Sequence, residues 1–199
     1  MDSTTSHIVS KWFEKKYREI DLQLADLSPQ CAKGCDWCCY QSIEILNWEE
    51  PLILEFINSQ LSKRQKNRIK KKLIDWFDYL DQKIPLKPIL TTEDVFEKFQ
   101  QMQGGDRKPC IFLHKHECLI YPVRPISCRT HVAEQKVLGC IENPLQDSSD
   151  EATNLRIRIL NEIIRKLPSS LELLNFAVAK MFELGYRKRP IEYHTLEAL

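Results

Sequence analysis

The chain has 199 residues and a formal net charge of +1, with 29% charged and 43% hydrophobic residues. A chain of this length can bury a sizeable hydrophobic core, so it does not depend on disulfides as staples. Its balanced charge excludes a strongly basic nucleic-acid-binding protein and an acidic disordered chain. No stretch approaches the roughly 20 apolar residues of a membrane helix, so no transmembrane segment is expected.

The N-terminal residues 1–7 are polar and lead into a charged segment, which is not the pattern of a secretory signal. We therefore expect a cytoplasmic protein, in a compartment where thiols stay reduced unless a metal binds them. For the same reason the eight cysteines are not expected to form four disulfides.

Apolar residues spaced by three and four predict an N-terminal helix over about residues 6–27, ended by Ser28 and Pro29. After a cysteine-rich segment, residues 42–46 alternate like a short strand. Asn47 then offers a cap for the next helix.

That next helix is expected over residues 49–59, and Ser62 with Gln65 forms a capping pair for another one. The buried side of this further helix is predicted to carry Ile69, Leu73, Trp76 and Leu80. A short helix at residues 92–102 completes a helical insertion that covers residues 49–102.

Seven basic residues lie within positions 63–72. They are consistent with a phosphate-binding face or with a solvated helix face. We favour the solvated face because no base-stacking aromatic residue shares it, and nucleic acid is not expected as a partner.

Two apolar runs, 110–113 and 118–121, flank a polar turn and predict a β-hairpin in which Cys110 and Cys118 need not be neighbours. Pro122 and Pro125 then predict an irregular, rigid path to Cys128.

The last third of the chain predicts a helical pair over residues 150–185, interrupted at Pro168 and restarted by Ser169 with Glu172, followed by a frayed tail. The expected fold is therefore mainly α, a single domain over residues 1–199 stabilised by metal. Its centre is a small, irregular core of β-hairpin and loop in the cysteine-cluster region 31–140.

The cysteines provide the candidate site. They are Cys31, Cys35, Cys38, Cys39, Cys110, Cys118, Cys128 and Cys140. Two thiolates separated by two residues can bind one metal from a tight turn, as at Cys35 and Cys38, and Gly34 allows such a turn. Because neighbouring side chains of an extended segment diverge, Cys38 and Cys39 are not expected to bind the same ion.

Eight thiols can form two four-thiolate sites, or one four-thiolate cluster with four packed or reactive thiols. A zinc ion with four thiolates carries a charge of about −2, which requires cations nearby when it is buried. Arg124, Arg129 and Lys108 are the candidates for those cations, and His131 is the best histidine candidate for a mixed site.

Four blocks in order, residues 31–39, 109–113, 118–121 and 124–129, resemble the YkgJ-type cysteine-cluster family, which is named for its CxxCxxCC motif. Here three residues, not two, separate Cys31 from Cys35. The resemblance implies chelation of zinc or iron by the eight cysteines and implies little about a reaction.

The leading hypothesis is an intracellular metalloprotein that chelates iron, as an iron–sulfur cluster, or zinc, with unknown activity and unknown protein partner. One alternative is a metal-dependent or thiol redox enzyme. Another is a zinc-stabilised binding module that uses the basic helix at residues 63–72.

Overall fold

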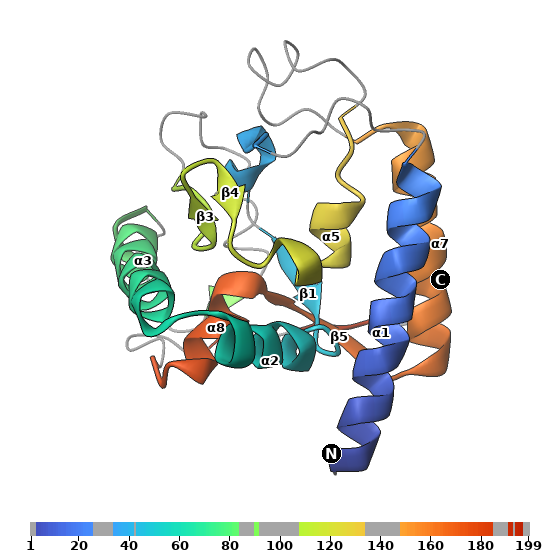
Figure 1. Cartoon of the computed structure of the whole chain (residues 1–199), viewed down its shortest axis with the longest axis horizontal. Coiled ribbons are helices and arrows are strands. Elements are labelled where there is room, and N and C mark those ends of the chain that lie inside the picture. Colours follow the sequence, from blue (N-terminus) through green and yellow to red (C-terminus); the bar gives the residue numbers. More distant parts are fainter. Residues whose placement is uncertain are drawn as a thin grey trace.

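The computed structural model describes residues 3–25, 34–41, 43–83, 90–91, 108–133, 148–184, 191–192 and 194–196. The helices are α1 (Ser3–Leu24), α2 (Glu50–Gln60), α3 (Lys63–Lys83), α5 (Ile126–Arg129), α7 (Asp150–Lys166) and α8 (Leu174–Met181), with 3-10 turns η1 (Trp37–Tyr40) and η3 (Tyr121–Val123). The strands are β1 (Glu44–Leu46), β2 (Leu90–Thr91), β3 (Leu113–His114), β4 (Glu117–Cys118), β5 (Ser169–Leu173), β6 (Ile191–Glu192) and β7 (His194–Leu196). The predicted mainly helical class is confirmed (Figure 1).

The predicted N-terminal helix is confirmed as α1, which lies beside α7 in Figure 1. Lys16 Nζ bridges the two helices by donating to Glu162 Oε2 at 2.9 Å. Residues 26–30, where the helix was expected to end, lie outside the described residues. No helix in the described ranges is both long and apolar enough to cross a membrane.

The predicted capping pair of α3 is confirmed. Ser62 N donates to Gln65 Oε1 at 2.8 Å, and Gln65 N donates to Ser62 Oγ at 3.3 Å, so each side chain satisfies the other residue's backbone. The four residues predicted for the buried side of this helix are all buried. The helix predicted at residues 92–102 lies outside the described residues.

The predicted role of Asn47 as a helix cap is wrong. Its side-chain oxygen accepts from Ser170 N at 3.0 Å, and its own backbone N donates to Ser170 O at 3.0 Å. Asn47 therefore joins the end of β1 to β5, while the residue before α2 is Glu49. Pro51 lies in the first turn of α2, as predicted.

The helix predicted to restart at Ser169 is also corrected, because residues 169–173 form strand β5 and the helix α8 begins only at Leu174. β5 lies between β1 and β7 in an antiparallel sheet, with Ile45 opposite Glu172. The Glu172 carboxylate does not cap a helix, since it accepts from Lys180 Nζ at 2.9 Å. The C-terminal region is thus helix, strand and helix.

The expected frayed tail is corrected as well. Residues 194–196 form β7 against β5, and residues 191–192 form β6, parallel to β2. Backbone pairing, which local sequence does not encode, orders these two short stretches.

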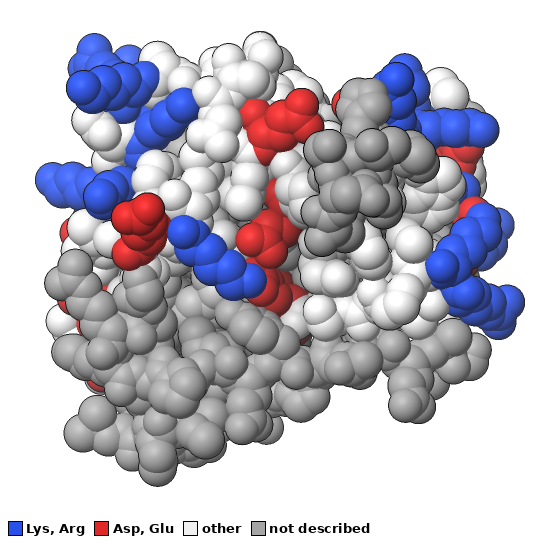
Figure 2. Space-filling model, turned by 90° about the horizontal axis from the view of Figure 1, so that it is seen from below, with Lys and Arg blue, Asp and Glu red and all other residues white. Residues whose placement is uncertain are grey.

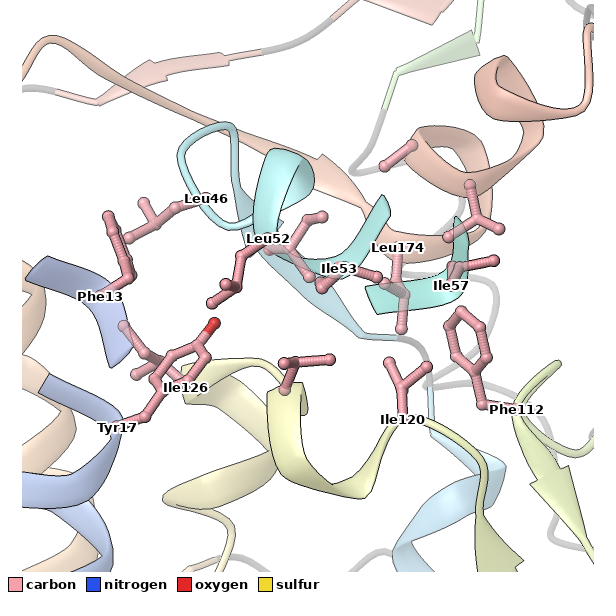
Figure 3. Close-up of a cluster of buried hydrophobic side chains, with 14 of the residues drawn as sticks. Phe13, Tyr17, Leu46, Leu52, Ile53, Ile57, Phe112, Ile120, Ile126 and Leu174 are labelled. Atoms are coloured by element: carbon pink, nitrogen blue, oxygen red, sulfur yellow. The ribbon is translucent and has the colours of Figure 1, made fainter. Parts of the chain in front are cut away.

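The core lies where α1, α2, α5 and the segment that follows β4 meet (Figure 3). Phe13 and Tyr17 enter it from α1, and Ile53 and Ile57 enter it from α2. Phe112, Ile120 and Ile126 close it from the opposite side, and Leu174 reaches it from the start of α8. Residues that follow Cys110 and Cys118, such as Phe112 and Ile120, are therefore anchored in the same core as the helices.

Glu49 is a carboxylate inside this core, only 1% exposed. Its Oε1 accepts from the Tyr17 hydroxyl and from Ile126 N, both at 2.8 Å. Its Oε2 accepts from Leu46 N at 3.0 Å. One side chain thus joins α1, β1 and the first residue of α5.

Burial raises the pKa of Glu49 above its ordinary value, because the core desolvates the carboxylate. The folded chain then holds this proton more tightly than the unfolded chain does. The stability linked to this proton is complete below the pKa of the unfolded chain and is lost as the pH rises through the pKa of the folded chain.

Replacing Glu49 by Gln is expected to lower the free energy of unfolding by about 1–3 kcal/mol, since one backbone or hydroxyl donor loses its acceptor. The penalty relative to the wild type should be largest in acid and shrink toward neutral pH. Urea unfolding at several pH values measures it, with Glu55→Gln on the exposed side of α2 as the control. A difference between wild type and Glu49→Gln that does not change with pH would contradict the assignment.

Candidate metal centre

The first cysteine segment turns at Gly34, whose φ of +95° lies in the left-handed region that glycine favours. Cys35 follows directly, and η1 carries Cys38 and Cys39. Cys39 N donates to Asp36 O at 2.9 Å, and Gln41 N donates to Cys38 O at 3.1 Å. The tight turn predicted for the Cys35 and Cys38 pair is present.

The expected divergence of Cys38 and Cys39 is wrong. The two thiols are hydrogen-bonded to each other. The prediction assumed an extended backbone, whereas the chain here is a 3-10 turn, in which neighbouring side chains need not point to opposite sides. Both cysteines are therefore available to the same centre.

The second cysteine segment joins the first through the backbone, because Cys110 N donates to Cys39 O at 2.6 Å. The predicted hairpin is confirmed with shorter strands, and Cys118 lies opposite Leu113 rather than Cys110. The turn residues Lys115 and His116 have φ values of 51° and 63°, which are strained for residues other than glycine.

A side-chain contact fixes this hairpin turn on the first cysteine segment. His116 Nδ1 lies 2.9 Å from Asp36 Oδ2. In the sequence, Asp36 lies between Cys35 and Cys38. The sequence alone did not predict this contact, because the two residues are 80 positions apart.

The predicted irregular path to Cys128 is wrong for its last residues, because Cys128 lies in the helical turn α5, which directly follows Pro125. Ile126 N at the start of α5 is held by Glu49, and Ser127 Oγ donates to Glu44 O at 2.8 Å. The position of Cys128 is thus set by β1 and by the residue that precedes α2.

The thiols of five cysteines interact electrostatically across these segments. Cys110 interacts with Cys39, Cys118 and Cys128, and Cys38 interacts with Cys118 and Cys128. The six described cysteines are all half-buried: Cys35, Cys38, Cys39, Cys110, Cys118 and Cys128. Cys31 and Cys140 lie outside the described residues.

Burial has the largest effect on the pKa of three of these thiols. It raises the pKa of Cys110 to about 12, raises the pKa of Cys118, and raises the pKa of Cys128 well above its ordinary value. The hydrogen bond between Cys38 and Cys39 lowers the pKa of Cys38 and raises that of Cys39. Burial therefore disfavours the thiolate forms of Cys110, Cys118 and Cys128, whereas the pKa of Cys38 is shifted in the opposite direction.

The three predicted cations have different environments. Arg129 is buried, stacks 4.2 Å from the Tyr17 ring and pairs with Asp21 at 2.5 Å, so it serves the structure. Lys108 lies over the ring of Tyr79. The Arg124 charge is close enough to lower the pKa of both Cys38 and Cys118.

The sequence missed a fourth cation, Lys72, because the basic helix looked uniformly solvated. Lys72 Nζ donates to the backbone oxygens of Leu113 and Cys110, the latter at 3.5 Å. Its spacing of four and eight residues from Arg68 and Arg64 was the signal that one stripe of this helix faces the hairpin.

The donor set fits a metal that prefers sulfur. Gathered thiols suit zinc or an iron–sulfur cluster, and the Nε of Arg124 is a buried donor with no hydrogen-bond partner among the described residues. Within those residues, no three cysteine, histidine or acidic side chains already form a metal-holding group. His131 Nδ1 lies 3.1 Å from Ser148 Oγ.

The pocket that borders Cys110 has a volume of about 20 Å³. That volume accepts about one water molecule. Trp76, Lys108 and Asn175 contribute to its walls.

Comparison with known families matches residues 30–146 to the model described as "CxxCxxCC: Putative zinc- or iron-chelating domain". The chain belongs to this family. The matched range contains all eight cysteines and ends before α7, and it confirms the resemblance inferred from the cysteine spacing. No curated protein and no solved structure matches the chain.

In the metal-free protein, iodoacetamide is expected to modify Cys38 before Cys39, Cys110, Cys118 and Cys128. The reason is that the thiolate is the reactive species and only Cys38, among these five, has a lowered pKa. Peptide mapping by mass spectrometry after short exposure measures the order, with urea-unfolded protein as the control. Equal rates in the folded protein would contradict the predicted order.

Proposed function

We propose that this chain holds iron, as an iron–sulfur cluster, or zinc through its cysteines. The eight cysteines proposed as ligands are Cys31, Cys35, Cys38, Cys39, Cys110, Cys118, Cys128 and Cys140. Membership of a zinc- or iron-chelating family supports metal binding in general. The specific metal, the ligand set and a cytoplasmic location are proposals.

The observation that carries the proposal is the gathering of buried thiols from segments about 70 residues apart. Cys38 and Cys39 share a hydrogen bond, and Cys110 is tied to Cys39 through the backbone. A bound metal supplies positive charge that stabilises thiolates and releases their protons.

Metal binding is also expected to stabilise the fold. The cysteine-bearing segments contact the core through Phe112, Ile120 and Ile126, so a centre that ties the segments together also holds the core closed. Binding energy of this kind is folding energy when the unfolded chain has no formed site.

The test is anaerobic purification followed by metal analysis and visible absorption. Replacing Cys110 or Cys128 by Ser should lower the bound metal and the melting temperature, because a hydroxyl is a poor ligand for these metals. Ser59→Ala is the control, since it removes the hydroxyl of an exposed serine on α2 and leaves every thiol in place. A colourless wild-type protein that holds neither metal and has fully alkylatable thiols would exclude this function.

A second candidate function, binding of an acidic protein surface, comes from the stripe Arg64, Arg68 and Lys72 on α3. Desolvation lowers the pKa of His114, and the positive charges of Arg68, Lys115, Lys72 and Arg64 lower it further. Positive groups from α3 and from the hairpin turn therefore converge beside the cysteine segment that Lys72 holds. Figure 2 shows basic side chains on the α3 side and also on the opposite side of that face, with acidic ones mostly nearer its middle.

Reversing the charge of Arg64 and Arg68 together is expected to weaken the binding of an oligoglutamate peptide. It should also make that binding less dependent on salt concentration. Lys66→Glu with Lys70→Glu is the matched control, because these residues lie off the stripe on the same helix and the charge change is equal. Fluorescence anisotropy at several salt concentrations measures the affinity. Equal losses in both double variants, or tighter binding of single-stranded DNA than of the peptide, would exclude this surface.

A further inference from the structure

Arg124 has a buried Nε with no hydrogen-bond partner among the residues that the structure describes. Buried polar groups in native proteins are nearly always paired, so an unpaired arginine donor requires an explanation. The rest of the side chain is well held. Its guanidinium lies 4.1 Å from the Tyr121 ring centroid, and Nη2 lies 3.6 Å from Asp21 Oδ1.

The neighbouring Arg129 provides a comparison, because the hydrogen bonds of its guanidinium are all made within the protein. Its Nε donates to Arg124 O at 2.9 Å, Nη1 donates to Asp21 at 2.5 Å, and Nη2 donates to Pro122 O. All three nitrogens of Arg129 have acceptors. Both arginines share Asp21, yet only Arg124 retains a buried donor without an acceptor.

Arg124 also lies within electrostatic reach of two cysteines from different segments. Its positive charge is near enough to act on both Cys38 and Cys118. Tyr121 covers the guanidinium although the tyrosine itself is 47% exposed, so this surface aromatic holds the plane of the arginine in place.

We propose that Arg124 donates its Nε–H to a sulfur of the bound metal centre on the side of Cys38 and Cys118, and that it neutralises part of the centre's negative charge. This inference rests on the proposed metal-binding function. Arg124 is a positioning residue that supplies charge and a directed donor, and it is not a ligand. Lysine would keep the charge but lose the planar donor that stacking orients.

The closing experiment uses the full chain loaded with zinc and measures the rate of zinc transfer to a chromogenic chelator. Arg124→Gln is expected to release zinc roughly 10- to 100-fold faster, the range found when groups around metal ligands are removed. Arg124→Lys should fall between that variant and the wild type. Tyr121→Leu should also speed release, because the charge stays but its orientation is lost.

Arg158→Gln is the matched control, since this arginine makes an exposed hydrogen bond from α7 to Gln23 of α1 and should release zinc at the wild-type rate. Unfolding of each metal-free variant by urea separates loss of fold from loss of the metal contact. If Arg124→Gln does not fold, Arg124→Lys and Tyr121→Leu carry the test.

Wild-type release rates in folded Arg124→Gln, or in both Arg124→Lys and Tyr121→Leu, would overturn the inference while leaving metal binding intact. A wild-type protein that binds no zinc and no iron would instead overturn the proposed function itself. If the loaded centre contains iron, the midpoint potential of Arg124→Gln should be lower than that of the wild type, because a nearby positive charge favours the reduced form.

Discussion

The buried carboxylate of Glu49 is the constraint on which the cysteine arrangement depends. Its two oxygens accept from Tyr17 in α1, from Leu46 in β1 and from Ile126 at the start of α5. A carboxylate in an apolar core is costly unless donors surround it, so these three segments are held in one relative position. Cys128 follows Ile126 by two residues and is therefore placed by the same contact.

The cysteine region is built by similar long-range contacts rather than by the local motif. Cys110 is joined to Cys39 through the backbone, and Lys72 of α3 donates to the backbone oxygens of Cys110, before β3, and of Leu113, the first residue of β3. The contact between His116 and Asp36 joins the strained turn to the first cysteine segment. Each contact uses a polar group that local sequence would assign to solvent.

Where prediction from local sequence failed, a residue that could have capped a nearby helix instead pairs with a residue distant in the chain. Asn47 and Ser169 both fit helix-cap patterns. In the structure, β1 instead pairs with β5, and the Asn47 side chain accepts from Ser170 N in β5. The prediction for Cys38 and Cys39 failed for a related reason, because a 3-10 turn replaced the extended backbone that was assumed. Capping at Ser62 succeeded because both partners lie within one helical turn.

The sequence by itself determined the helical class, the apolar stripes of α1, α3 and α7, and membership of the cysteine-cluster family, since periodicity and cysteine spacing are local properties. Only the tertiary structure decided which cysteines meet, which cation lies beside them, and that residues 169–173 form a strand. These outcomes depend on contacts between residues far apart in the chain, such as Glu49 with Ile126 and Asn47 with Ser170. The free energy of such contacts comes from burial and pairing in the folded chain, which no local pattern encodes.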